Sequence, residues 1–160
     1  MSDQPAIAVV GGGIAGLAFA LALHQRGMAC DVYEGVAEVK ELGVGITLLP
    51  HAIKELAALG LLPQLEAAGI ENRESVFFNR FGQRVYGELR GRLAGYELPE
   101  IGIHRGKLHR MLFEAALQRL GPGHVHTGYR CNALDQDDDG VTLTFSDGPD
   151  GPVAPVRAQW

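Results

Sequence analysis

The sequence has few of the features that mark specialised classes of protein. It contains 2 cysteines in 160 residues, and Cys30 and Cys131 lie too far apart for a metal-ligand or redox spacing. This scarcity of cysteine is typical of a reducing compartment rather than of a disulfide framework. The apolar stretch over residues 14–23 is too short to span a bilayer, and no targeting segment is recognisable. We therefore expect a cytoplasmic protein.

Positive charge is also scarce. The chain has 14 lysines and arginines against 19 aspartates and glutamates, and its net charge is −5. It therefore lacks the basic face that nucleic-acid binding needs, and its charge argues against binding to an anionic membrane. A hydrophobic content of 46% and a charged content of 21% are typical of a globular protein. The length suffices for one domain with a substantial core but hardly for two.

Glycine, in contrast, is abundant, and the 22 glycines cluster at particular places. An apolar run over residues 7–10 predicts a buried parallel strand that ends in three glycines. A helical pattern over residues 14–26 follows and ends at Gly27. A second strand is predicted over residues 29–33, with Glu34 at its end. Strand, helix and strand in this order predict a βαβ unit.

The rest of the chain alternates between helical and strand patterns. A loop containing Gly43 and Gly45 precedes the second predicted helix. The further predicted elements are helices over residues 50–59, 63–68 and 105–120, a β-hairpin over 74–89, a third parallel strand over 124–127, and two antiparallel strands between 129 and 145 that join at 137–140. The predicted fold class is therefore α/β and Rossmann-like, with a parallel sheet, flanking helices and a β-meander.

The first predicted turn carries a Gly-x-Gly-x-x-Gly motif directly between a strand and a helix. In such a turn the first glycine permits the tight bend, and the second lets the backbone approach a pyrophosphate. The third lets the helix pack closely on the sheet. Free N–H groups and the positive end of the helix dipole attract phosphate. The candidate cofactor-binding residues of this turn are Gly11, Gly13, Ile14, Ala15 and Gly16.

Glu34 is a candidate partner for the adenosine end of such a cofactor. It stands at the end of the second predicted strand, where a carboxylate can accept hydrogen bonds from ribose hydroxyls. Strand, turn, helix and acid together favour dinucleotide binding over a glycine-rich turn without a ligand. The motif alone does not distinguish NAD from FAD.

Two later phrases make that distinction, namely LGVGITLLP at residues 42–50 and IHRGKL at residues 103–108. Together with the glycine motif they resemble the flavoprotein monooxygenases that hydroxylate aromatic rings, a family that includes the salicylate, para-hydroxybenzoate and phenazine-carboxylate hydroxylases. The resemblance covers essentially the whole chain in order. It implies FAD as the cofactor, NADH or NADPH as the reductant, and O₂ and a small aromatic compound as the substrates.

The resemblance also implies individual contacts with FAD. Glu34 would bind the adenosine ribose, and the backbone at Cys131 would contact the adenine. Gly45 would run past the isoalloxazine, and Arg105 would contact the flavin side of the cofactor. The resemblance implies no acid, base or nucleophile within these residues.

The placement of Arg105 supports its role independently. It stands with Lys107 and Arg110 in the first turns of a predicted helix, where the helix dipole disfavours cations. A nearby cofactor phosphate would relieve this arrangement. The alternative is that all three side chains point into water, where each unfavourable contact costs under about 1 kcal/mol.

Two positions depart from the family pattern, and two further features that suggest a metal site do not form one. Gly35 follows the ribose-binding acid where many relatives have a basic residue, and His51 replaces a frequent asparagine. The stretch over residues 135–140 matches half of an EF-hand loop, but its twelfth position is Ser146 and its flanks predict strands. The 6 histidines form no metal-ligand pattern and are interpreted as ordinary structural residues.

The resemblance also predicts a division of the chain into domains. Residues 1–70 and 101–160 would form an incomplete FAD-binding domain, and residues 71–100 would form a hairpin of the substrate domain. Family members are much longer, so we expect the sequence to be the N-terminal part of a longer parent. A flavin amine oxidase, a nicotinamide dehydrogenase and an inactive nucleotide-binding fragment are the alternatives. The aromatic substrate and the oligomeric state are not indicated.

Overall fold

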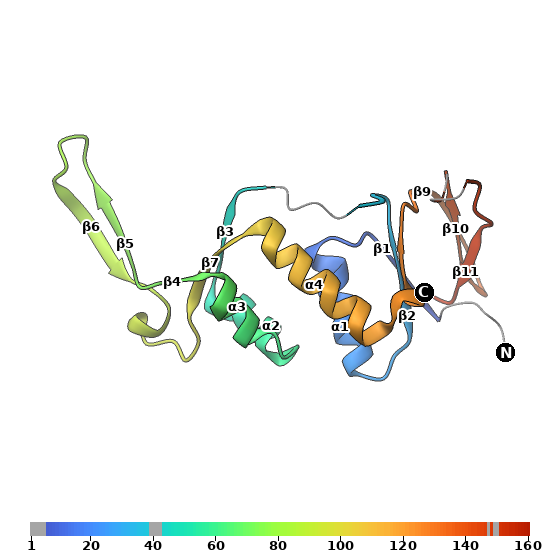
Figure 1. The fold of residues 1–160 in the computed structure, drawn as a ribbon, viewed down its shortest axis with the longest axis horizontal. Helices are drawn as coiled ribbons and strands as arrows, with labels where there is room; N and C mark the ends of the chain where they lie inside the picture. The colour runs from blue at the N-terminus through green and yellow to red at the C-terminus, as the bar shows by residue number, and fades with distance from the viewer. Residues whose placement is uncertain (1–5, 39–42, 147, 149–150) are drawn as a thin grey trace. The chain divides into compact units, whose positions relative to one another are not determined.

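The computed structural model describes residues 6–38, 43–146, 148 and 151–160. The chain forms two compact units. The first comprises Met1–Lys40 and His109–Trp160, and the second comprises Glu41–Leu108. Figure 1 shows the course of the helices and strands in both.

The first unit contains the predicted βαβ motif. Strands β1 (Ile7–Val10), β2 (Cys30–Glu34) and β8 (Val125–Thr127) form a parallel sheet in the order β1-β2-β8. Helix α1 (Ile14–Gln25) joins β1 to β2 and packs against both strands. The predicted motif and the third parallel strand are thus confirmed. The core between this helix and the sheet is formed by apolar side chains: Val9, Leu17, Ala20, Leu21 and Val32.

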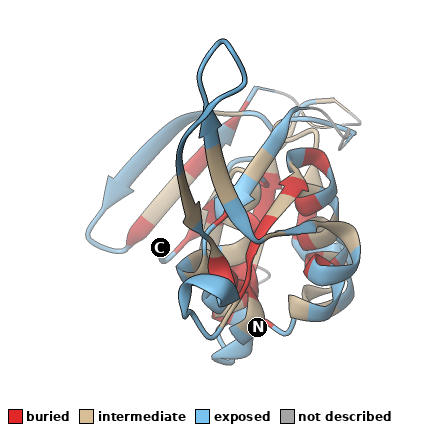
Figure 2. Cartoon of the chain, turned by 90° about the vertical axis from the view of Figure 1, so that its left-hand side faces the viewer, coloured by how far each residue is buried: buried red, intermediate tan, exposed pale blue. Residues whose placement is uncertain are grey.

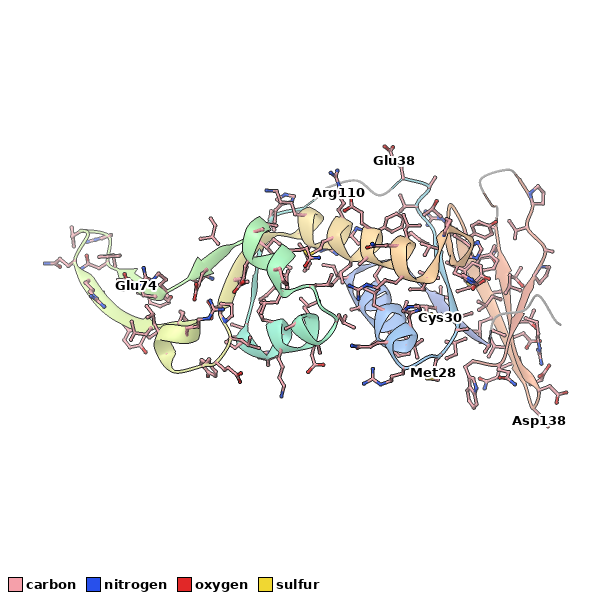
Figure 3. The ribbon with its side chains drawn as sticks, turned by 60° about the horizontal axis from the view of Figure 1, so that its bottom comes forward. Met28, Cys30, Glu38, Glu74, Arg110 and Asp138 are labelled. Atoms are coloured by element: carbon pink, nitrogen blue, oxygen red, sulfur yellow. The ribbon has the colours of Figure 1, made fainter. Side chains whose placement is uncertain are left out.

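A second, antiparallel sheet completes the first unit. It consists of β9 (Cys131–Asp137), β10 (Gly140–Phe145) and β11 (Val156–Ala158), in the order β11-β10-β9. Strands β9 and β10 are the predicted antiparallel pair, whereas β11 was not among the predicted elements. Asp138 lies at the tip of the hairpin that joins β9 to β10, as Figure 3 shows. A solvent-exposed hairpin turn, flanked by strands, therefore occupies the stretch that resembles half of an EF-hand loop.

The second unit is built on a small antiparallel sheet. Strands β3 (Gly45–Leu48), β7 (Glu100–His104) and β4 (Ile70–Asn72) form it in the order β3-β7-β4. Helices α2 (Pro50–Ala58) and α3 (Leu62–Ala68) pack against this sheet. The prediction of a loop with Gly43 and Gly45 before the helix at residue 50 was wrong in part, because residues 45–48 form β3. Strand β3 pairs with β7, which lies far along the chain, so this pairing leaves no pattern in the local sequence.

The predicted hairpin is also present in the second unit. Strands β5 (Glu74–Phe78) and β6 (Arg84–Leu89) pair with each other in antiparallel register. Their residues are exposed or half-buried, as Figure 2 shows. Large apolar side chains of the hairpin are exposed, namely Phe77, Phe78, Val85 and Tyr86 on the strands and Phe81 in the turn between them.

Helix α4 (Arg105–Leu120) has the predicted bounds. One side of this helix is buried, with Leu108 and Leu112 fully inaccessible to solvent. Short 3-10 helices η1 (Gly91–Ala94) and η2 (Pro122–His124) complete the described structure. Within the described residues, no helix has both the length and the apolar character needed to cross a bilayer.

Candidate functional site

The glycine-rich turn between β1 and α1 is shaped by two glycines that the backbone itself requires. Gly11 has a φ of 103°, in the region that favours glycine, and its N–H donates to the carbonyl of Tyr33 over 2.8 Å. A Cβ atom at Gly16 would lie 1.9 Å from the carbonyl oxygen of Gly11. The tight bend expected at Gly11 is therefore visible in the geometry, whereas Gly16 lets the first turn of α1 lie directly against the Gly11 carbonyl.

Gly13 differs from its two neighbours in the motif. Its φ of −75° suits any residue, and a Cβ atom there would meet no described atom within 4 Å. The packing of the described residues thus gives no reason for glycine at this position. Gly13 is exposed and forms the N-cap of α1. A side chain there would occupy the open space beside the helix N-terminus, where an anionic ligand approaches most closely.

The N-terminus of α1 is available to an anion. The first turn of the helix has no acidic side chain, and no side chain among the described residues caps it. The first backbone N–H groups of a helix have no partner within the helix, so those of Ile14 and Ala15 are potential donors to a ligand. Ala15 is exposed and Ile14 is half-buried.

Glu34, at the end of β2, accepts a hydrogen bond from the glycine-rich turn. Its Oε2 accepts a hydrogen bond from the Gly12 N–H over 2.7 Å, and its Oε1 accepts one from the Val36 N–H over 2.9 Å. A carboxylate has about four acceptor positions, so Glu34 retains capacity for two further donors such as ribose hydroxyls. A Cβ atom at Gly12 would lie 2.9 Å from the Glu34 Cβ, so this position also needs glycine.

His109 of α4 contacts the same turn, which sequence analysis did not predict. Its Nε2 lies 2.5 Å from the Gly12 carbonyl oxygen. Because a carbonyl oxygen only accepts, the Nε2–H of His109 is the donor. The two residues are 97 positions apart, so no local sequence signal could have revealed the pair.

The segment before β9 lies beside the end of β2. The Tyr129 N–H donates to the Glu34 carbonyl over 2.8 Å. A Cβ atom at Gly35 would lie 3.6 Å from the Arg130 Cα and 3.7 Å from its Cβ, so Arg130 lies directly beside Gly35. Cys131 follows as the first residue of β9 and is half-buried. The turn, Glu34 and the segment that leads into Cys131 thus belong to one unit.

The other two predicted site residues lie together in the second unit. Gly45 begins β3 and pairs with His104 of β7, and Arg105 follows as the first residue of α4. The Arg105 N–H donates to the Val44 carbonyl over 3.0 Å, and the His104 Nε2–H donates to the Gly43 carbonyl over 3.0 Å. The two sequence phrases therefore form one local structure.

Arg105 also packs against this loop with its side chain. A Cβ atom at Gly43, which has a φ of 127°, would lie 3.4 Å from the Arg105 Cβ and 3.5 Å from its Cδ. Arg105 itself is exposed, so its guanidinium is available to a ligand. Leu42, the first residue of the phrase, lies outside the described residues.

Two histidines form a separate cluster around Asp31 on β2. The Asp31 carboxylate accepts from His124 Nδ1 over 2.7 Å and from His126 Nε2 over 3.2 Å. The His126 ring stacks on Tyr33, with 4.7 Å between the ring centroids. Burial raises the pKa of Asp31, but the two imidazole hydrogen bonds outweigh this effect and hold it below its ordinary value. The cluster joins β2 to η2 and β8, and the described residues contain no grouping that could hold a metal ion.

The second unit also contains a cavity of about 800 Å³. His51 and Lys54 of α2 line it, together with Glu88 and Arg90, which form an ion pair. None of the predicted site residues lines this cavity.

Residues 4–160 match the family model described as FAD binding domain. The chain is 38% identical to a phenazine 1,6-dicarboxylic acid hydroxylase of Lysobacter antibioticus, over 99% of this chain and 43% of that protein. It is also 38% identical to a 3-amino-4-hydroxybenzoate 2-monooxygenase of Streptomyces platensis, over 92% of this chain and 37% of the relative. The chain therefore spans about two fifths of the length of these curated relatives.

Solved structures show the same similarity. The fold matches that of a p-nitrophenol 4-monooxygenase from Pseudomonas putida with a TM-score of 0.87 and 24% identity, over the whole of this chain and 40% of that one. The HpxO protein of Klebsiella pneumoniae, solved with FAD and uric acid, matches with a TM-score of 0.73 and 29% identity. That match covers 94% of this chain and 36% of the other.

Proposed function

The chain belongs to the FAD binding domain family, and from this premise we propose that it binds FAD through the glycine-rich turn of its first unit. The observation that carries the proposal is Gly13, because the structure leaves an open space there that a Cβ atom would enter. The α1 N-terminus beside it presents free N–H donors to the pyrophosphate of the cofactor.

The adenosine end of FAD would lie along the end of β2. Glu34 would accept hydrogen bonds from the ribose hydroxyls with the acceptor capacity that Gly12 and Val36 leave free. The backbone at Cys131 would contact the adenine, which the link between Tyr129 and Glu34 supports by bringing that segment to the end of β2.

The flavin end would be bound by residues of the second unit. Gly45 would let the backbone pass close to the isoalloxazine, and the permanently charged guanidinium of Arg105 would contact the flavin side of the cofactor. The contacts of Arg105 with Val44 and Gly43 support this proposal, because they tie the arginine to the loop that would accept the ring.

The proposed activity belongs to a longer protein of which this chain is the N-terminal part. That protein would hydroxylate a small aromatic compound with O₂ and take its electrons from NADH or NADPH. FAD, when bound, supplies this redox chemistry, and the residues of this chain bind and orient it. Relatives named as hydroxylases and monooxygenases support the proposal. The test compares NADH or NADPH oxidation by the longer protein with and without an aromatic compound. Stimulation of the oxidation by the compound would support the proposal, and the absence of stimulation would contradict it.

The proposed domain division assigns residues 1–70 and 101–160 to FAD binding and residues 71–100 to a substrate domain. The exposed apolar side chains of β5 and β6 support the second assignment, because a two-stranded hairpin needs a further partner to be stable in water. The cytoplasm is the proposed location, which the two free cysteines support.

A ligand series tests the binding proposal. We expect FAD and ADP to bind the chain, whereas FMN, which lacks the AMP half and therefore the pyrophosphate, binds far more weakly. Fluorescence titration with FAD and FMN, and competition of ADP against FAD, measure these affinities. Equal affinity for FMN and FAD would contradict the assignment of the turn and Glu34 to the adenosine and pyrophosphate end.

A further inference from the structure

Gly12, at the centre of the glycine-rich turn, has both of its backbone polar groups bonded to side chains. Its N–H donates to Glu34 Oε2 over 2.7 Å, and its carbonyl accepts from His109 Nε2 over 2.5 Å. These side chains come from different segments, the end of β2 and helix α4. Gly12 is buried, whereas Gly13, the next residue, is exposed.

The hydrogen bond from His109 determines the direction of a potential phosphate donor. The Gly12 carbonyl and the Gly13 N–H belong to the same peptide unit. In a planar trans peptide these two groups point in opposite directions. When His109 holds the carbonyl, the Gly13 N–H therefore points away from α4.

This peptide unit needs an external restraint because of its sequence. It lies in a run of three glycines, and glycine has access to far more of φ/ψ space than other residues. No side chain within the run limits its rotation. The hydrogen bonds from Glu34 and His109 supply the restraint that the local sequence lacks.

We propose that His109 is a positioning residue of the pyrophosphate-binding turn, and that it orients the Gly13 N–H toward the cofactor through the Gly12 carbonyl. This inference rests on the proposed function, since it assumes that the turn binds a pyrophosphate. His109 itself does not touch the cofactor. Its effect is to restrict the unbound turn to fewer conformations, so that less conformational entropy is lost when the ligand binds.

Substitutions that keep or remove the donor test the inference. His109→Phe keeps a ring of similar size and removes the N–H, whereas His109→Gln keeps an amide N–H at similar reach. Since a buried acceptor loses its partner, we expect His109→Phe to raise the Kd for ADP and for FAD about tenfold. His109→Gln should restore most of the affinity. His24→Phe, in the exposed last turn of α1, is the matched control and should bind as the unaltered chain does.

Adenosine provides the readout that a merely structural role would not reproduce. It lacks the pyrophosphate, so its affinity should be the same in the unaltered chain and in His109→Phe. If His109→Phe does not fold, His109→Asn replaces it, because the shorter amide does not reach the Gly12 carbonyl, and circular dichroism verifies the fold.

Three outcomes would overturn the inference. The first is unchanged ADP and FAD affinity in the variants that lack the hydrogen bond, and the second is an equal loss of adenosine binding. The third is that the unaltered chain binds neither ADP nor FAD, in which case the proposed function fails and the inference fails with it. Only the first two leave the proposed function intact, so the two failures are distinguishable.

Discussion

Replacement of Gly13 by leucine separates a ligand-binding role of this residue from a structural one. A Cβ atom at Gly13 would meet no described atom within 4 Å, and the φ of −75° is accessible to leucine. The folded chain should therefore tolerate the substitution, with a loss of at most about 1 kcal/mol from the poorer N-cap. FAD, in contrast, would meet a four-carbon side chain where its pyrophosphate approaches the helix.

The size of the effect on binding follows from the hydrogen bonds lost. A hydrogen bond to a charged group contributes about 1.5–3 kcal/mol, so the loss of two N–H contacts to phosphate costs at least about 3 kcal/mol. This corresponds to an increase of about 100-fold or more in the Kd for FAD.

Fluorescence titration of FAD, together with urea unfolding, would measure both quantities. Gly123→Leu is the matched control, because Gly123 lies in η2 and a Cβ atom there also meets no described atom within 4 Å. We expect this control to bind FAD as the unaltered chain does. Undiminished FAD binding by Gly13→Leu would refute the argument that the open space at Gly13 accommodates the cofactor.

Three further predictions concern the remaining parts of the site and its support. Gly16→Ala should lower the free energy of unfolding by about 2 kcal/mol or more in urea denaturation, because its Cβ would lie 1.9 Å from the Gly11 carbonyl oxygen; unchanged stability would show that the turn relaxes freely. The depressed pKa of Asp31 contributes stability that is present above the ordinary carboxyl pKa of about 4 and is lost as the pH falls. Asp31→Asn should therefore flatten the pH dependence of the free energy of unfolding below this value. Urea titrations at several pH values would reveal the difference. Arg105→Ala should weaken FAD binding but leave ADP binding unchanged. Lys107→Ala, at an exposed neighbouring position, is the control and should leave the affinity for both ligands unchanged. An equal loss of ADP affinity in Arg105→Ala would contradict the assignment of Arg105 to the flavin side.

The first unit illustrates what a single sequence can predict. Strand β1, the glycine-rich turn, α1 and β2 follow one another along the chain, so the apolar run, the glycine spacing and the stop at Gly27 predict them directly. Helix α4 has its predicted bounds for the same reason, because its apolar periodicity is local.

Features that depend on distant residues could not be predicted in this way. Strand β3 exists because it pairs with β7, and residues 45–48 carry no strand signal of their own strong enough to distinguish them from a loop. The bonds of His109 to Gly12 and of His124 to Asp31 join residues 97 and 93 positions apart. Histidine is compatible with many environments, so its partners become visible only in the folded structure.

Gel filtration after incubation with FAD shows whether this chain binds the cofactor. We expect the absorbance of oxidised flavin to elute with the protein, whereas Gly13→Leu, folded to the same extent, should elute without it. A colourless unaltered chain would show that the chain does not bind FAD, and equal retention of flavin by Gly13→Leu would show that the open space at Gly13 does not accommodate it.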